Sequence, residues 1–116
     1  MQGDQDASQL LFELPAAARA VQFREACGRI VERCRELKAS RAMLTATTLD
    51  ISEKELKAGL AALAGAGCGP GFKLACVTPD RHSFEQLVKV EDSALGHGVS
   101  VRVFFDQDNA RRWLAW

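Results

Sequence analysis

The chain has 116 residues, of which 47% are hydrophobic and 26% are charged, and its 15 basic residues balance 15 acidic ones. This length and composition are those of one globular domain, and they exclude a disordered tail or a fibrous repeat. Because the net charge is zero, there is no positive field to gather phosphates, which argues against nucleic acid as a partner.

The start of the chain, Met1 to Asp6, is polar and acidic. It lacks the basic and apolar parts of a secretory signal, and no apolar run approaches the roughly 20 residues that a membrane span needs. We therefore expect a cytoplasmic protein without a membrane span, with residues 1–8 disordered.

Four cysteines occur, at Cys27, Cys34, Cys68 and Cys76, and none of them forms a C-x-x-C pair. Zinc sites and thioredoxin-type centres use that paired spacing, so we expect neither a metal nor a cofactor. In a reducing compartment these residues stay thiols. A free cysteine on a helix face acts as a small apolar packing group.

The first half of the chain predicts strand, helix, strand and helix. Leu10, Phe12 and Leu14 alternate with other residues as in a strand, and Pro15 is expected to open a helix over about residues 16–38. Residues 41–48 favour a second strand. Ser52 stands three residues before Glu55, which is the spacing of a capping box at the start of the second helix. The glycine-rich residues 65–71 follow this helix, so they indicate a turn and not a phosphate-binding loop, which precedes a helix.

The second half repeats the same order. Residues 72–78 favour a third strand, and a helix is expected over about residues 83–95. Its sheet-facing side is predicted to consist of Phe84, Leu87, Val88, Glu91 and Leu95. Residues 99–105 alternate as in a fourth strand. Asp106 is expected to cap a last short helix that packs through Ala110, Trp113 and Leu114.

This order predicts an α/β fold with an open four-stranded, mainly parallel sheet in sequential order, a β/α superhelix. One face of the sheet is expected to be polar, because the strands place these residues on it: Glu13, Thr45, Lys73, Ser100 and Arg102. Helices should therefore lie mainly on the other face. A sheet without a reversal of strand order lacks the crevice in which doubly wound folds bind cofactors.

Two segments resemble the STAS-like family related to bacterial anti-sigma-factor antagonists. They are Gly98-Val99-Ser100-Val101-Arg102-Val103-Phe104-Phe105-Asp106, followed by Ala110 and Trp113-Leu114, and Lys73-Leu74-Ala75-Cys76-Val77-Thr78-Pro79-Asp80. The resemblance implies a single STAS-like domain over residues 1–116, a bacterial origin and a role in signalling through protein contact. Members usually begin with an antiparallel strand pair, so an edge strand here is missing or supplied by a partner.

In signalling members of that family a phosphorylated serine starts the second helix, and Ser52 holds a comparable place. The surrounding Leu49-Asp50-Ile51-Ser52-Glu53 differs from the family's Asp-Ser-Ser-Gly-like pattern. Phosphorylation of Ser52 and a purely structural capping box are therefore two alternatives.

Polar residues also follow the strands at one edge of the sheet, where ligands bind in parallel sheets. This possible ligand or partner edge consists of Thr48, Asp50, Thr78, Asp80, Arg81, His82 and Asp106. The alternative is that the aspartates are helix caps and that His82 is a surface loop residue. No catalytic residue is assigned, because no nucleophile is paired with a base.

Aromatic residues near the C-terminus form a possible interface. The residues are Phe104, which falls on the polar sheet face by alternation, and the two tryptophans Trp113 and Trp116. An apolar patch there suggests a homodimer or a protein partner, unless the N-terminal arm or the last helix covers it. The preferred function is thus a non-enzymatic interaction module. The alternative is a carrier or sensor of a small apolar or anionic ligand, and an enzyme is the least supported class.

Overall fold

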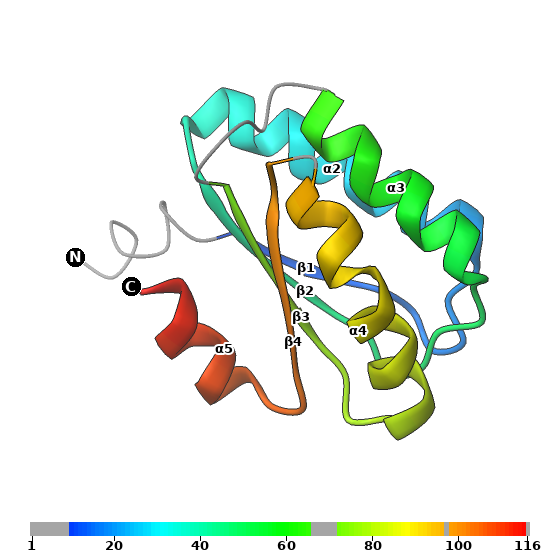
Figure 1. Ribbon diagram of the computed structural model, residues 1–116. Helices are drawn as coiled ribbons and strands as arrows, with labels where there is room; N and C mark the ends of the chain where they lie inside the picture. The colour runs from blue at the N-terminus through cyan, green and yellow to red at the C-terminus, as the bar shows by residue number, and fades with distance from the viewer. Residues whose placement is uncertain (1–9, 66–71, 97, 116) are drawn as a thin grey trace.

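The computed structural model describes residues 10–65, 72–96 and 98–115 of the chain (Figure 1). The elements in order are β1 (Leu10–Glu13), α2 (Ala20–Leu37), β2 (Arg41–Thr45), α3 (Glu53–Gly65), β3 (Lys73–Val77), α4 (Arg81–Gly96), β4 (Ser100–Phe104) and α5 (Gln107–Leu114). The strands form one sheet in the order β1-β2-β3-β4, and each pair is parallel. The predicted open sheet in sequential order is confirmed. None of the helices in the described part of the chain has the length and hydropathy of a membrane-spanning segment.

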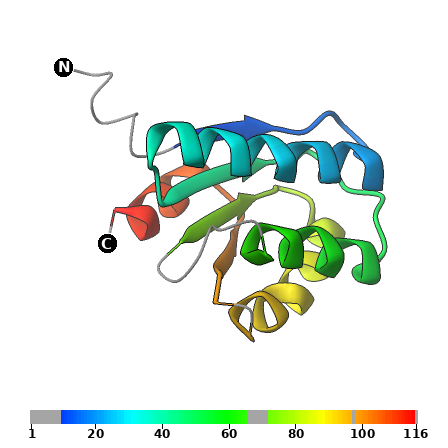
Figure 2. The same ribbon diagram turned by 90° about the horizontal axis from the view of Figure 1, so that it is seen from above.

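Three helices, α2, α3 and α4, cover one face of the sheet, and α5 lies against the other (Figure 2). The three-helix face holds the main core, because alternate strand residues point into it. From the strands these are Ala42, Leu44, Leu74, Cys76, Val101 and Val103, and from the helices Phe23, Ile30, Leu56, Leu60, Leu87 and Val90. Full burial of a large apolar side chain contributes about 1.5–3 kcal/mol each.

The second face of the sheet is polar at its margins and apolar in its centre. Met43, Ala75 and Val77 are buried there against Ala110 and Leu114 of α5. A lone sheet face with this centre would expose apolar surface to water, and the short amphipathic α5 removes it. Helices therefore lie mainly, but not only, on one face.

The first helix starts later than Pro15 suggested, and that prediction is wrong. Ala17 adopts a left-handed φ of 54°, and Ala18 forms a parallel bridge with Leu49. The Ala18 N–H donates to the Thr48 carbonyl at 3.2 Å, and the Asp50 N–H donates to the Ala18 carbonyl at 2.8 Å. The chain after β1 thus keeps pairing with the segment after β2, which delays the helix to Ala20.

The sheet-facing side of α4 also differs from the prediction. Its buried residues are Ser83, Leu87, Val90 and Ala94, whereas Val88 and Leu95 are 41% and 63% exposed. The helix is rotated because the Ser83 hydroxyl is held inward by the loop after β2, where it accepts the Leu49 N–H at 2.9 Å. Ser83 thus takes an inward position that apolar spacing alone did not predict, while Leu87 is buried as predicted and Phe84 is partly buried against the main core.

The two edge strands of the sheet are β4 and β1, and they differ in their surroundings. On β4, the Val103 N–H points away from β3 and donates to Oε2 of Glu91 at 3.0 Å. Burial raises the pKa of the Glu91 carboxyl, while this bond and Arg102 lower it in part. On β1, Leu11 is 53% exposed. A side chain that occupies an edge N–H prevents another strand from pairing there.

Several predictions lie outside the described residues. These are the disorder of residues 1–8, the turn over residues 66–71, and the positions of Cys68 and Trp116.

Candidate interaction surface

The polar residues after the strands act mostly as supports for the loops. Oγ1 of Thr48 accepts the Ala17 N–H at 2.8 Å. Thr78 is fully buried, and its Oγ1 donates to the Thr47 carbonyl at 3.3 Å and accepts the Asp80 N–H at 3.3 Å. Buried hydroxyl groups with such partners hold a backbone in place.

Asp80 begins α4 as a helix cap. Its Oδ2 accepts the Ser83 N–H at 2.9 Å and the Ser83 hydroxyl at 2.8 Å. These two bonds, the backbone one first, lower the pKa of the Asp80 carboxyl below its ordinary 3.8. Since the Ser83 oxygen also binds the Leu49 N–H, the cap ties α4 to the loop after β2. This agrees with the structural alternative for Asp80.

The capping box at the start of α3 is confirmed. The Glu55 N–H donates to Oγ of Ser52 at 3.2 Å, and the Ser52 N–H donates to Oε1 of Glu55 at 3.4 Å. Asp50, Arg81 and His82 have exposed side chains. They stand at loop and helix ends, and none of the three lines either of the two hollows described below.

A hollow does occur at this edge, but other residues form it. It has a volume of about 360 Å³ and is lined by Glu13, Leu14, Thr45, Ala46, Thr47, Val77, Pro79 and Gln107. None of the seven strand-end residues named above lines it, but Thr47, which follows β2 at the same edge and directly precedes Thr48, does. Alternation places side chains on faces of the sheet, but it does not show which loop leaves space between them.

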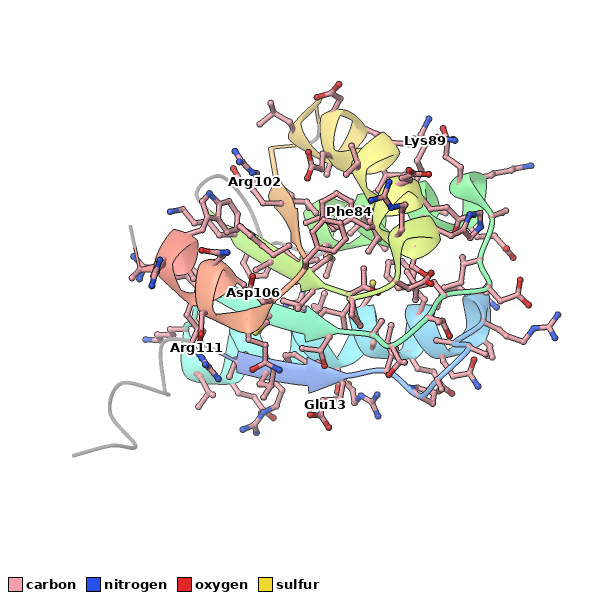
Figure 3. The ribbon with its side chains drawn as sticks, turned by 90° about the horizontal axis from the view of Figure 1, so that it is seen from below. Glu13, Phe84, Lys89, Arg102, Asp106 and Arg111 are labelled. Atoms are coloured by element: carbon pink, nitrogen blue, oxygen red, sulfur yellow. The ribbon has the colours of Figure 1, made fainter. Side chains whose placement is uncertain are left out.

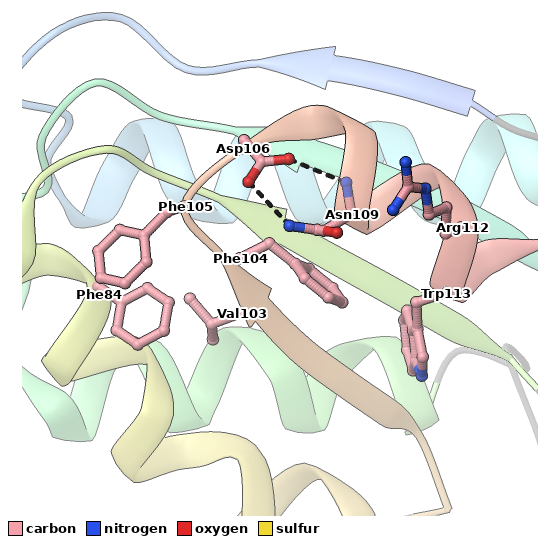
Figure 4. Close-up of a pocket in the computed structure, with 8 residues that line it drawn as sticks. All are labelled: Phe84, Val103, Phe104, Phe105, Asp106, Asn109, Arg112 and Trp113. Carbon is pink, nitrogen blue, oxygen red and sulfur yellow. Dashed lines mark hydrogen bonds between the residues drawn. The ribbon is translucent and has the colours of Figure 1, made fainter.

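A larger hollow lies beside β4 and α5, and we call it the aromatic groove (Figure 4). Its volume is about 470 Å³, and its lining is Phe84, Val103, Phe104, Phe105, Asp106, Asn109, Arg112 and Trp113. It thus combines four aromatic rings with a polar rim. Of the residues predicted as an interface or a strand-end site, it contains Phe104, Trp113 and Asp106.

The rings form two pairs that line the groove (Figure 4). The centroids of Phe84 and Phe105 are 4.0 Å apart with an interplanar angle of 6°. Those of Phe104 and Trp113 are 5.8 Å apart, tilted by 46°. Phe104 is half-buried under α5, while Phe105 is 51% exposed. The last helix therefore covers part of the patch and leaves its outer end in water.

The polar rim comes from the start and the outer side of α5. Oδ1 of Asp106 accepts the Asn109 N–H at 2.9 Å, and Oδ2 accepts from Nδ2 of Asn109 at 3.0 Å. Asp106 thus caps α5, as expected. Arg112 is exposed, and it has no hydrogen-bond or ion-pair partner among the residues that the structure describes. Figure 3 shows this side of the molecule, with Arg102 on β4, Phe84 on α4 and Asp106 at the start of α5.

The described cysteines lie in the core, away from the groove. Cys27, Cys34 and Cys76 are all buried. Burial raises the pKa of both the Cys27 and the Cys76 thiol to about 12. Since the thiolate is the reactive form, these are packing groups. Within residues 10–65, 72–96 and 98–115 no cluster of three His, Cys, Asp or Glu side chains is arranged to hold a metal ion.

The sequence did not predict the exposed ring of Phe105, and the reason lies at the end of β4. Strict alternation assigned Phe105 to the buried face with Val101 and Val103, but β4 ends at Phe104. The signal for this end was present in Asp106, because a helix cap requires the strand to stop before it. Phe105 therefore belongs to the turn, where its ring stacks on Phe84.

Comparisons of the chain with protein-family models, with curated proteins and with solved structures give no significant match. Its function is therefore inferred from the geometry of the groove and of the strand ends.

Proposed function

We propose that this protein is a non-enzymatic interaction module of STAS-like type, and that the aromatic groove is its docking surface for a protein. The single observation that carries the proposal is an aromatic groove of about 470 Å³ that is open to solvent and has Phe105 51% exposed at its outer end.

Aromatic side chains are the usual anchors of protein interfaces. Phe and Trp rings bury large areas on contact, and Arg is enriched beside them. The groove presents this composition, with Phe105 and Trp113 near its two ends and Arg112 on the rim. The exposed ring of Phe105 and the accessible parts of the other three rings are costly to leave in water, so a partner that covers them gains free energy.

The use of the strand-end side chains supports the non-enzymatic part of the proposal. Thr78 and Asp80 are engaged in loop and cap hydrogen bonds, and Asp106 caps α5. A general base must instead be free to reach the proton of a reacting group. These residues are already fixed by their structural partners.

Site-specific photo-crosslinking tests the docking surface. A photoreactive phenylalanine analogue is placed at Phe105 and, as the control, at Val88, which is 41% exposed on α4. In cells that express the full chain, we expect one reproducible protein adduct from position 105 that is absent from position 88. The adduct should disappear when Trp113→Ser is added. Equal labelling from both positions, or none from position 105, contradicts the proposal.

A second candidate function is a carrier or sensor of a small apolar or anionic ligand. The observation that favours it is the guanidinium of Arg112 beside an apolar cavity, a pairing that suits an aromatic ring bearing an anionic group. Native mass spectrometry of freshly purified protein separates the two functions. A bound small molecule that is lost in Arg112→Ala supports the carrier, whereas a protein complex without added mass supports the module.

A regulatory role through Ser52 belongs to the same proposal, with a bacterial origin and a cytoplasmic location. A phosphate at Ser52 would lie at the N-terminus of α3, where the helix dipole and free N–H groups stabilise it. It would have to displace the present bond from the Ser52 hydroxyl to Glu55 at 3.1 Å. If phosphoproteomic maps of native cells repeatedly lack a phosphorylated Ser52 peptide, the proposed regulation through Ser52 is wrong.

A further inference from the structure

The outer side of α5 carries charges of opposite sign one helical turn apart. Asp108 lies in its first turn, and Arg112 lies in its last turn. Residues four apart share a face of a helix. The side chain of Asp108 is 83% exposed, and its ion pair with Arg111 is long, at 3.7 Å. Arg112 is exposed and without a partner among the described side chains.

This pattern is complementary to itself when the helix is turned end to end. In an isologous contact, residue i of one copy meets residue j of the other and the reverse also holds. Two α5 helices that run antiparallel across a twofold axis place Asp108 of each copy opposite Arg112 of the other. Two parallel copies would instead set like charges side by side, which is unfavourable.

The aromatic groove borders this face of α5, because Arg112 is part of its lining. Phe105 stands just before the helix, and Trp113 lies at its far end. An antiparallel contact therefore directs Phe105 of one copy toward the Trp113 end of the other. The result is an apolar centre of rings with ion pairs around it, which is the usual anatomy of an interface.

We propose that the occupant of the aromatic groove is a second copy of this chain, docked with the two α5 helices antiparallel and with paired Asp108 and Arg112 side chains. This inference rests on the proposed function, and it names the partner. The other possible occupant, a different protein with acidic and apolar groups, is an outcome of the test.

Exchange of the two charges between copies provides the experiment. Asp108→Arg and Arg112→Asp are purified separately and studied by sedimentation equilibrium, alone and as an equimolar mixture. In a dimer of either variant alone, position 108 of each copy faces a side chain of the same charge at position 112 of the other. The dimer of either variant should therefore dissociate more readily, with an affinity about tenfold lower than that of the wild type. In the mixture, position 108 of either variant faces a side chain of opposite charge at position 112 of the other. Both contacts are then attractive, so a heterodimer close to wild-type affinity is expected. Glu32→Arg, a reversal at an exposed position of α2, is the matched control and should leave the wild-type dimer unchanged.

The outcomes separate this inference from the proposed function. If the wild type dimerises but the mixture is no tighter than either variant alone, the antiparallel contact is wrong. If the wild type is a monomer while position 105 crosslinks to another protein, the proposed dimer is wrong, but the proposal that the aromatic groove is a docking surface is supported. If the wild type is a monomer and no crosslink forms, both proposals fall. Circular dichroism of each variant checks that α5 still folds, and Phe105→Ser, which leaves the charges intact, should also weaken the dimer.

Discussion

Replacing Gly59 of α3 by alanine should destabilise the protein, because the added Cβ has no room there. An ideal Cβ at Gly59 would lie 2.5 Å and 2.9 Å from two ring carbons of Phe23, and 3.5 Å from Sγ of Cys27. Phe23 of α2 is only 1% exposed. Its ring is enclosed by the core, so moving it disturbs the packing between α2, α3 and the sheet.

A second helical glycine offers a matched control that isolates this steric cost. At Gly28 on α2 an added Cβ meets nothing within 4 Å. Glycine to alanine in a helix interior gains about 1 kcal/mol in propensity at either position, while overpacking a core costs about 1–3 kcal/mol. The free energies of unfolding of Gly59→Ala and Gly28→Ala should therefore differ by about 1–3 kcal/mol. At roughly 4 °C per kcal/mol for a domain of this size, the melting temperatures should differ by about 4–12 °C.

Urea unfolding and thermal melts of the two variants measure the difference. The urea m-values should agree with that of the wild type, so that the shift reports stability alone. A smaller side chain at position 23 should relieve the clash with the added Cβ. The double variant with Phe23→Leu and Gly59→Ala should therefore lose less stability than the sum of the losses in the two single variants. Equal stability of Gly59→Ala and Gly28→Ala, or strict additivity with Phe23→Leu, would refute the close approach of α2 and α3 at Gly59.

Three further predictions concern the edge of β4, the α3 cap and the thiols. The pKa of Glu91 is raised above its ordinary value of 4.5 in the folded protein. The stabilisation from the protonated Glu91 carboxyl is therefore complete below pH 4.5, and it is lost as the pH rises through the raised pKa. The variant Glu91→Gln keeps an acceptor for the Val103 N–H but does not ionise. Its free energy of unfolding relative to that of the wild type, measured by urea titration, should therefore increase between about pH 4 and about pH 7. A difference between the two proteins that stays constant over this range contradicts the prediction. Ser52→Ala should cost about 1 kcal/mol through loss of the cap, and Ser52→Asp less, by the same assay; equal losses in both variants would reject the capping role. Iodoacetamide should leave Cys27 and Cys76 unlabelled in the folded protein and modify them in urea, as peptide mapping can show; rapid labelling of the folded protein would contradict their burial.

Much of the architecture followed from local patterns along the chain. The alternation of strands and helices, together with right-handed crossovers, led to a parallel sheet in sequential order, which is the observed order. The Ser52 and Asp106 caps also follow from short spacings. Such features depend on contacts within three or four residues, so the local sequence specifies them.

The candidate surface depended on contacts between distant segments. Phe84 and Phe105 come from α4 and from the turn after β4, and their rings meet only when both segments pack at one end of the sheet. The rotation of α4 is set by the bond between Ser83 and Leu49, 34 residues apart. Periodicity cannot report such a bond, because it counts apolar positions and leaves out polar side chains that are buried with a partner.

The sequence by itself determined which segments are strands and helices, their order in the sheet and the capped starts of α3 and α5, because these depend on periodicity and short-range hydrogen bonds. Only the tertiary structure decided that α5 crosses to the second face and that the aromatic side chains form an open groove. The physical reason is that Met43, Ala75 and Val77 come from separate strands and form an apolar centre only once the sheet is assembled. That centre holds α5 in place, and the position of α5 sets the shape of the groove.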